Sequence, residues 1–211
     1  GHGGKDPGTL GTGRYPVTEK HVVLEIALLV GNYINTEFPD VNVIYTRQTD
    51  AFVKLSERTR IANEAKADLF ISIHCDAFHN ESVHGTTTYV MGLHKTESNL
   101  NVAIRENSSI LMEDNYNLNY EGFNPSEPES YIALSMYQSN HLNNSLLLAS
   151  KIQKQFKNRV SRKDRGVKQA GFMVISRASM PSVLVELGFL TNHLEEDFLN
   201  SEDGKIYMAS A

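Results

Sequence analysis

The chain has 211 residues, 40% of them hydrophobic, and a formal net charge of −5. This length suits one domain, or one domain with a large insertion, and the apolar content suffices for a packed core. The acidic balance argues against nucleic acid as the main partner, because phosphate binding needs clustered lysine and arginine. No apolar run approaches the ~18 residues of a transmembrane segment. The single cysteine, Cys75, excludes an internal disulfide and a multi-cysteine zinc site.

Hydrophobic spacing predicts helices and strands that alternate along the chain. In chain order they are a helix over 19–36, a strand over 41–46, a helix over 55–66, strands over 69–73 and 85–91, a helix over 146–156, strands over 172–175 and 183–185, and a helix from 194 onward. This alternation is typical of a three-layer α/β/α fold with a mostly parallel or mixed central sheet. We expect residues 1–211 to form a single domain.

Residues 94–145 differ in composition from the rest of the chain. They contain seven acidic and two basic residues, and ten of the eighteen asparagines. Within them, residues 97–114 are predicted to be helical. We therefore expect one acidic, asparagine-rich helical insertion within an otherwise neutral domain.

Two residues near the start of the chain could bind a metal. His2 lies in a run with four glycines, GHGGKDPG, which predicts a sharp turn close to another group. A turn with an incidental histidine is the simpler interpretation, and no phosphate-binding glycine motif is present. Glu19 opens the first predicted helix, where a carboxylate either favours the helix dipole or serves as a rigidly held ligand.

Two further candidates lie in predicted strands. His74 ends the strand over 69–73, at the carboxyl end where α/β sheets usually bind ligands. Cys75 should then point into the core on the opposite face, and Asp76 either orients a ring or forms a turn. Glu186 stands in the apolar run PSVLVELGF, where a buried carboxylate is costly unless a metal, a proton relay or a basic partner compensates it.

Together, His2, Glu19 and His74 supply two imidazoles and one carboxylate. This is a known hydrolytic zinc set, and a second glutamate such as Glu186 is the usual base beside it. The spacing is discontinuous and does not match the compact HExxH pattern, so chemistry alone makes the zinc site a hypothesis.

At these residues the sequence resembles the zinc-dependent N-acetylmuramoyl-L-alanine amidases, which cut bacterial peptidoglycan. Four separated motifs carry the resemblance, in the family's order and over nearly the whole chain. They are residues 1–8 (GHGGKDPG), Glu19, residues 72–77 (SIHCDA) and residues 185–192 (VELGFLTN). The family's first strand normally precedes the first motif, so we expect further residues before Gly1.

The resemblance implies one Zn²⁺ held by His2, Glu19 and His74, with Glu186 as the general base. The implied reaction is hydrolysis of the amide between the lactyl group of N-acetylmuramic acid and L-alanine. It also implies peptidoglycan as the substrate and a location in the cell envelope, periplasmic or exported. A non-catalytic peptidoglycan-binding module and another zinc peptidase on a similar scaffold are the alternatives.

The acidic segment over 94–145 carries a second implication. Family members that act in cell separation are similar in having an insertion here, whose helix covers the zinc until a protein activator displaces it. We therefore expect an autoinhibited enzyme, and predict that Glu106, or otherwise Glu113, reaches the metal as a fourth ligand. For any single acid, solvation of an exposed helix is the simpler explanation.

Overall fold

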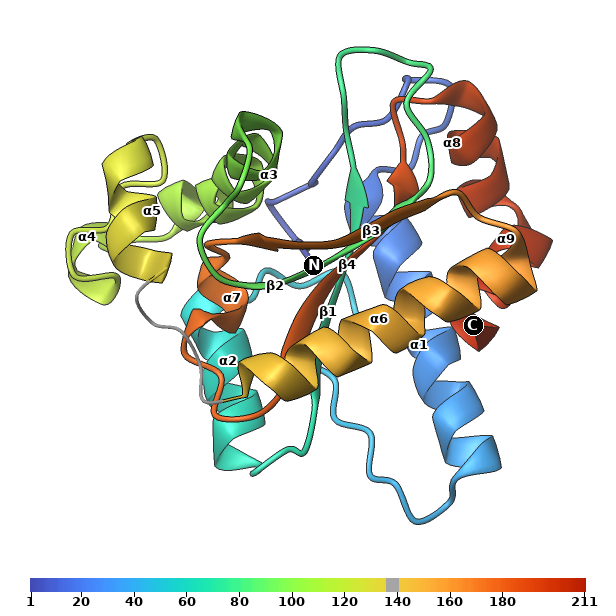
Figure 1. Ribbon diagram of the computed structural model, residues 1–211, viewed down its shortest axis with the longest axis horizontal. Helices are drawn as coiled ribbons and strands as arrows, with labels where there is room; N and C mark the ends of the chain where they lie inside the picture. Colours follow the sequence, from blue (N-terminus) through green and yellow to red (C-terminus); the bar gives the residue numbers. More distant parts are fainter. Residues whose placement is uncertain (136–140) are drawn as a thin grey trace.

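A computed structural model describes residues 1–135 and 141–211, and confirms the α/β fold expected from the sequence (Figure 1). The elements, in chain order, are α1 (Glu19–Glu37), α2 (Leu55–Glu64), β1 (Phe70–Asp76), β2 (Thr86–Met91), α3 (Glu97–Asn107), the 3₁₀ helix η1 (Ser108–Met112), α4 (Tyr116–Asn119), α5 (Pro128–Ser135), α6 (Leu142–Val160), β3 (Asp164–Ala170), α7 (Met173–Ser176), β4 (Ser182–Phe189), α8 (His193–Asn200) and α9 (Glu202–Ser210).

The strands of the described residues form one mixed sheet in the order β1-β4-β2-β3. β1 pairs with β4 in parallel, and β2 pairs with β3 in parallel. The two central strands, β2 and β4, are antiparallel. This topology puts the carboxyl ends of β1 and β4 side by side.

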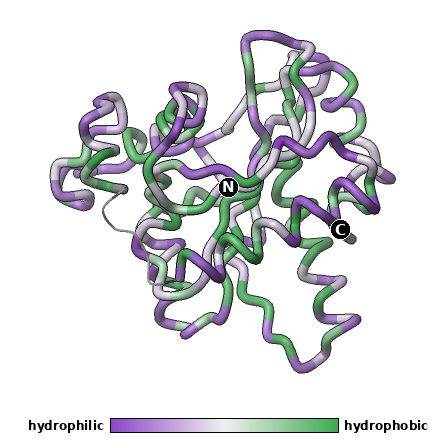
Figure 2. The backbone as a smooth tube through the Cα atoms, viewed as in Figure 1, coloured by the Kyte–Doolittle hydropathy of each residue, from purple (hydrophilic) through white to green (hydrophobic). Residues whose placement is uncertain are grey.

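Two hydrophobic cores cover the two faces of the sheet, because alternate residues of a strand point to opposite faces. In β4, Leu184 belongs to the core that α2, α3 and α7 complete. Its neighbours Val183 and Val185 belong to the core formed with α1, α6, α8 and α9. The result is a helix–sheet–helix arrangement, and Figure 2 shows hydrophobic residues gathered along the central strands.

Two predicted strands are wrong. Residues 41–46 are irregular, with Val41 and Ile44 about half exposed, and they pair with no strand of the described residues. β-Branched residues favour a strand mainly where a neighbouring strand packs against them. Residues 172–175 lead into the buried helix α7, because a short apolar run does not distinguish a buried strand from a buried helix.

Sequence reasoning also missed one strand and misplaced some helix ends. β3 has the mostly polar sequence DRGVKQA and lies at an edge of the sheet, where half-buried side chains give no clear apolar pattern. α6 begins at Leu142, before the predicted start. The helix predicted from residue 194 is two helices, separated at Ser201, whose hydroxyl accepts a hydrogen bond from the Gly204 amide at 3.0 Å.

The acidic segment contains α3, η1, α4 and α5, which gather at one end of the molecule in Figure 1. The helix predicted over 97–114 is α3 followed by the 3₁₀ helix η1. Residues 136–140 of the predicted insertion lie outside the described residues, and α6 begins within its predicted range. Over the described parts of the chain, none of the helices combines the length and apolar character of a membrane span.

The buried carboxylate of Glu195 ties two strands together. It accepts hydrogen bonds from the backbone amides of Gly85 at 3.1 Å and Phe189 at 2.8 Å, and it pairs with Arg162. Gly85 precedes β2 and Phe189 ends β4. One side chain of α8 therefore fixes the ends of both central strands at the same edge.

We expect Glu195→Ala to lower the free energy of unfolding by about 2–4 kcal/mol, because two backbone donors and a guanidinium lose their buried acceptor. Urea unfolding followed by circular dichroism measures this change. The control is Glu81→Ala, at a side chain that is 71% exposed, which should change stability by less than ~0.5 kcal/mol. Equal stability of parent and Glu195→Ala would contradict the assignment.

Candidate metal centre

The glycine-rich loop holds His2 in a fixed orientation. His2 has a φ of 50°, which is uncommon for a residue with a side chain. The Asp6 carboxylate lies 2.8 Å from its Nδ1 atom. Gly8 has a φ of +65°, and a Cβ there would lie 2.6 Å from the His2 ring. The turn thus requires glycine and directs Nε2 of His2 into the protein.

Glu19 and His74 come from the start of a helix and from a strand. Glu19 is the first residue of α1 and is fully buried, so it is more than a solvated group at a helix end. Its carboxylate accepts hydrogen bonds from the backbone amides of Thr9 at 2.8 Å and Cys75 at 2.9 Å. His74 lies in β1, and Cys75 packs in the opposite core, as strand alternation predicts.

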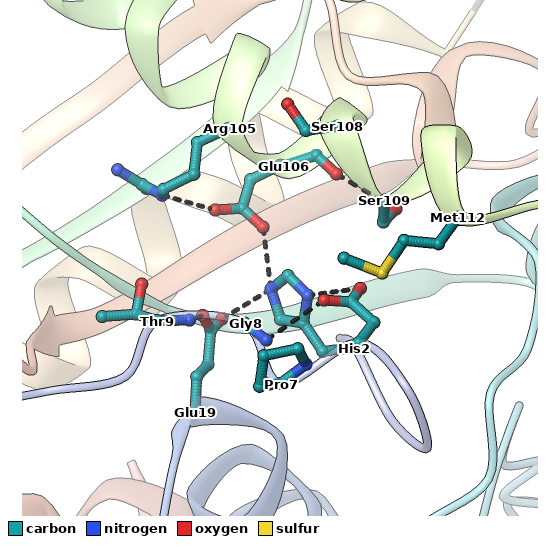
Figure 3. Close-up of a pocket in the computed structure, with 11 residues that line it drawn as sticks. His2, Pro7, Gly8, Thr9, Glu19, Arg105, Glu106, Ser108, Ser109 and Met112 are labelled. Atoms are coloured by element: carbon teal, nitrogen blue, oxygen red, sulfur yellow. Dashed lines mark hydrogen bonds and ion pairs between the residues drawn. The ribbon is translucent and has the colours of Figure 1, made fainter.

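These three predicted ligands meet at one point. Nε2 of His2 and Nδ1 of His74 each lie 3.1 Å from Oε1 of Glu19. Nε2 of His2 nevertheless makes no hydrogen bond among the described residues. A cavity of about 180 Å³ adjoins the cluster (Figure 3). The fold therefore brings together residues that are far apart in the sequence and points their donor atoms at a common centre.

Glu106 of α3 joins the same cluster. Its Oε2 atom lies 3.0 Å from Nε2 of His2 and 2.7 Å from Nδ1 of His74. One ligand atom from each of these residues and from Glu19 lies within 4.8 Å of the others. Figure 3 shows Glu106 approaching His2 from the opposite side to Glu19.

Glu113, the alternative to Glu106, lies elsewhere. Its carboxylate accepts hydrogen bonds from the Tyr120 hydroxyl at 2.6 Å and from the Leu55 backbone amide at 3.2 Å. Leu55 is the first residue of α2. Glu113 therefore attaches the acidic segment to the start of a scaffold helix.

Glu186 lies beside the cluster, paired with His74 in the register of β1 and β4. It is fully buried, and neither carboxylate oxygen has a hydrogen-bond partner among the described residues. Burial, together with the negative charges of Asp76 and Glu106, raises the pKa of Glu186 well above its ordinary value; Arg105, 3.8 Å away, opposes this rise. An unpartnered buried carboxylate with a raised pKa is typical of a proton-transfer group.

Attraction between the imidazoles and the carboxylates shifts the pKa values of His2 and Glu106 in opposite directions. Burial lowers the pKa of His2, but Glu19, Asp6 and Glu106 outweigh it and hold that pKa well above its ordinary value. Burial raises the pKa of Glu106, and the imidazoles of His74 and His2 outweigh it and hold that pKa well below its ordinary value. Carboxylates and imidazole nitrogens converging in this way are suited to a divalent cation.

Several residues of the site were missed by sequence reasoning. The ring of His2 is held by Asp6, which follows it by four residues in the same loop; that spacing was the available signal. Asp76 instead accepts hydrogen bonds from the Ala77 amide and from Arg105, both at 2.8 Å. Arg105 also binds Oε1 of Glu106 at 3.0 Å. Its place in the acidic segment gave no indication of these long-range contacts.

Comparison with known proteins agrees with this geometry. The family model for N-acetylmuramoyl-L-alanine amidase matches residues 1–211. The chain belongs to this amidase family. It is 33% identical over 214 residues to AmiA of Escherichia coli (strain K12), covering 100% of this chain and 71% of AmiA. It is 34% identical to AmiC of Neisseria meningitidis serogroup B, covering 96% of this chain and 47% of AmiC. The amidase thus spans about half the length of that relative.

Solved amidase structures share the fold. The catalytic domain of CwlV from Bacillus (Paenibacillus) polymyxa var. colistinus matches the whole chain with a TM-score of 0.68 and 27% identity, over 88% of that structure. The N-acetylmuramoyl-L-alanine amidase of Clostridium difficile 630 matches with a TM-score of 0.72 and 25% identity, over 87% of that structure. The amidase is therefore a peptidoglycan hydrolase by family.

Proposed function

We propose that this amidase uses one zinc ion to hydrolyse the amide bond between the lactyl group of N-acetylmuramic acid and L-alanine in peptidoglycan. The observation that carries the proposal is the convergence of His2, Glu19 and His74 beside Glu186, a buried carboxylate that has no hydrogen-bond partner among the described residues. Peptidoglycan lies outside the cytoplasmic membrane, so the proposal includes a periplasmic or exported location in the cell envelope.

The donor atoms fit zinc. Two imidazole nitrogens and one carboxylate form a common catalytic zinc set, which leaves a position for water or substrate. Asp6 holds the His2 ring at Nδ1, and the buried Nε2 has no hydrogen-bond partner among the described residues, which is the arrangement expected of a metal ligand supported by an outer carboxylate. His2, Glu19 and His74 would therefore hold the ion, and it would supply Lewis acidity towards water and the scissile carbonyl.

Glu186 would move the proton. Its open oxygens can accept a proton from the attacking water and return it to the L-alanine nitrogen as the peptide leaves. A raised pKa makes the carboxylate a stronger base, and burial keeps bulk water from competing for the proton. Because Glu186 stands beside His74 in the sheet, the base is fixed relative to the metal ligands.

We expect the parent chain to bind about one zinc ion, and His2→Ala or His74→Ala to lose most of it. Asp6→Asn should weaken zinc affinity by about 10–100-fold, because it disturbs the ring orientation of His2 without removing a ligand. Metal analysis after dialysis and chelator competition measure both effects. The exposed His79 offers the matched control, since His79→Ala should bind zinc as the parent does. Equal loss in the control would refute the ligand assignment.

We expect Glu186→Gln to reduce turnover by about 10²–10⁴-fold, because the amide keeps the shape of the side chain but accepts no proton. The assay is digestion of purified peptidoglycan with the products read by mass, together with the zinc content. Glu81→Gln, at an exposed site, is the control. Retained turnover, or loss of zinc together with activity, would contradict a role as base.

We further propose that the acidic segment holds the resting enzyme inactive. The Oε2 atom of Glu106 faces both imidazole nitrogens, so it would compete with water or the scissile carbonyl for a metal held there. Its neighbour Arg105 reaches Asp76 at 2.8 Å and lies 3.8 Å from Glu186. One turn of α3 therefore covers the metal ligands and the base together.

Contacts away from the metal ligands anchor this segment. The Asn107 side-chain amide donates to the Gly171 carbonyl at 2.8 Å and accepts from the Met173 backbone amide at 2.8 Å. Glu113 binds the start of α2 through Leu55. A protein activator would have to bind the displaced segment better than the docked one, because only a difference in affinity shifts the equilibrium.

We expect Asn107→Ala to increase the rate of wall digestion by roughly 5–150-fold, the usual range for such coupling, since docking of α3 loses two buried hydrogen bonds. Glu106→Gln should also increase it, by weakening the contact with the imidazoles. Asn101→Ala, at an exposed position of the same helix, is the control. If the zinc-loaded parent digests peptidoglycan as fast as both variants, the segment is not inhibitory.

A further inference from the structure

A second cavity, of about 40 Å³, lies across α3 from the metal centre. One of its walls is formed by α3, and the other includes Asp76, Tyr89, Arg165, Lys168 and Phe189. The larger cavity lies on the His2 side, and Arg105 of α3 lines both. α3 therefore stands between the two cavities, which would join into one groove across the site if α3 were displaced; the cavity on the far side holds only about one water molecule.

Two basic residues of β3 line this second cavity. The Arg165 guanidinium lies 5.1 Å from the centre of the Phe189 ring, and it donates one hydrogen bond, to the His84 carbonyl, at 3.3 Å. Its Nε atom is buried and has no hydrogen-bond partner among the described residues. Lys168 is half-buried, with Nζ 6.0 Å from the centre of the Tyr89 ring.

Arg165 and Lys168 have no carboxylate partner among the described residues. Neither forms an ion pair within the described parts of the chain. Asp76, in the same cavity wall, is already bound by Arg105 and by the Ala77 amide. Burial and the neighbouring charge of Arg165 lower the pKa of Lys168, so keeping both cations here is unfavourable until an anion joins them. The arrangement is suited to a carboxylate ligand.

The register of the sheet gives the distance from the base. Glu186 of β4 pairs with Thr87 of β2, and Tyr89, two residues on and hence on the same face, pairs with Lys168 of β3. Neighbouring strands lie ~4.8 Å apart, so β3 is roughly 10 Å across the sheet from β4. Two residues of an extended peptide cover about 7 Å of this span, and the Lys168 side chain reaches back over Tyr89 of β2 across part of the remainder.

We propose that Arg165 and Lys168 form a subsite for a carboxylate of the peptidoglycan stem peptide, at the second residue beyond the scissile amide. This inference rests on the proposed function, because it takes the peptide that follows L-alanine as the ligand. That peptide continues with a γ-linked D-glutamate, whose α-carboxylate is free in some walls and amidated in others. The subsite selects the free acid.

The cavity on the His2 side supports an orientation in which the stem peptide runs towards β3. The cavity on the His2 side is lined by Pro7, Gly8, Thr9 and other residues, and the only lysine or arginine among its described lining residues is Arg105. Arg105 belongs to α3 and leaves with it. Once α3 is displaced, Arg165 and Lys168 are the lysine and arginine left among the described residues that line the two cavities, so we infer that the acidic peptide extends towards β3 and the sugar towards Gly8.

The test compares two substrates that differ in one charge, N-acetylmuramoyl-L-alanyl-D-glutamate γ-methylamide, whose α-carboxylate is free, and the same compound with that α-carboxylate as an amide; the γ-carboxyl is blocked in both, as it is in the wall. All proteins are full chains loaded with zinc and carrying Asn107→Ala to free the groove. We expect a lower KM for the acid than for the amide. Lys168→Gln and Arg165→Gln should each raise the KM for the acid about five- to tenfold. The KM for the amide and both kcat values should change less than twofold.

The matched control is Lys154→Gln, which removes the same charge from the exposed side of α6. An equal KM rise in this control would overturn the subsite by showing a general charge effect. Equal KM values for acid and amide in the parent, or equal changes for both substrates in the variants, would also overturn it. Cleavage of neither substrate counts against the proposed function instead. Calorimetry with L-alanyl-D-glutamate γ-methylamide and its α-amide then decides the subsite, and equal or absent binding refutes it.

Discussion

The site depends on the neutralisation of four carboxylates buried within one small region. Glu19, Asp76, Glu106 and Glu186 are each at most 4% exposed. Isolated buried charges cost several kcal/mol each, so every one of these groups needs a cation, a hydrogen-bond donor or a proton. Among the described residues, Arg105 pairs with Asp76 and Glu106, and the imidazole nitrogens of His2 and His74 each lie 3.1 Å from Glu19. A metal ion between the imidazoles would answer the same need more completely.

The fold positions these groups on rigid elements. Glu19 opens a helix, His74 and Glu186 are register partners on parallel strands, and the turn around His2 is closed by Asp6. The carboxyl ends of neighbouring parallel strands are the usual ligand-binding edge of an α/β sheet. Buried Glu195 ties the end of β4 to the start of β2 at this same edge, so the position of Glu186 also depends on a residue outside the cluster.

The sequence predicted those parts of the site in which a residue conflicts with its local surroundings. Glu186 in an apolar strand and His2 among glycines are such conflicts, and both lie at the centre. Asn107 and Arg105 gave no such signal, because their partners lie 66 and 29 residues away, respectively, and a helix surface commonly carries both residue types. β3 was missed for a related reason: an edge strand is defined by its pairing with β2, while its own side chains are mixed in polarity.

The proposed resting state explains why substrate alone would be a poor activator. α3 presents a carboxylate to the imidazoles and a guanidinium to the acids near Glu186, so it already satisfies the charges that peptidoglycan would meet in the groove. Its anchors, Asn107 on the 171–173 segment and Glu113 on α2, make contacts that a ligand in the groove does not replace. Substrate would therefore compete with only part of the docking energy. The remainder has to come from a partner that binds the acidic segment itself, which separates the control of activity from the recognition of the wall.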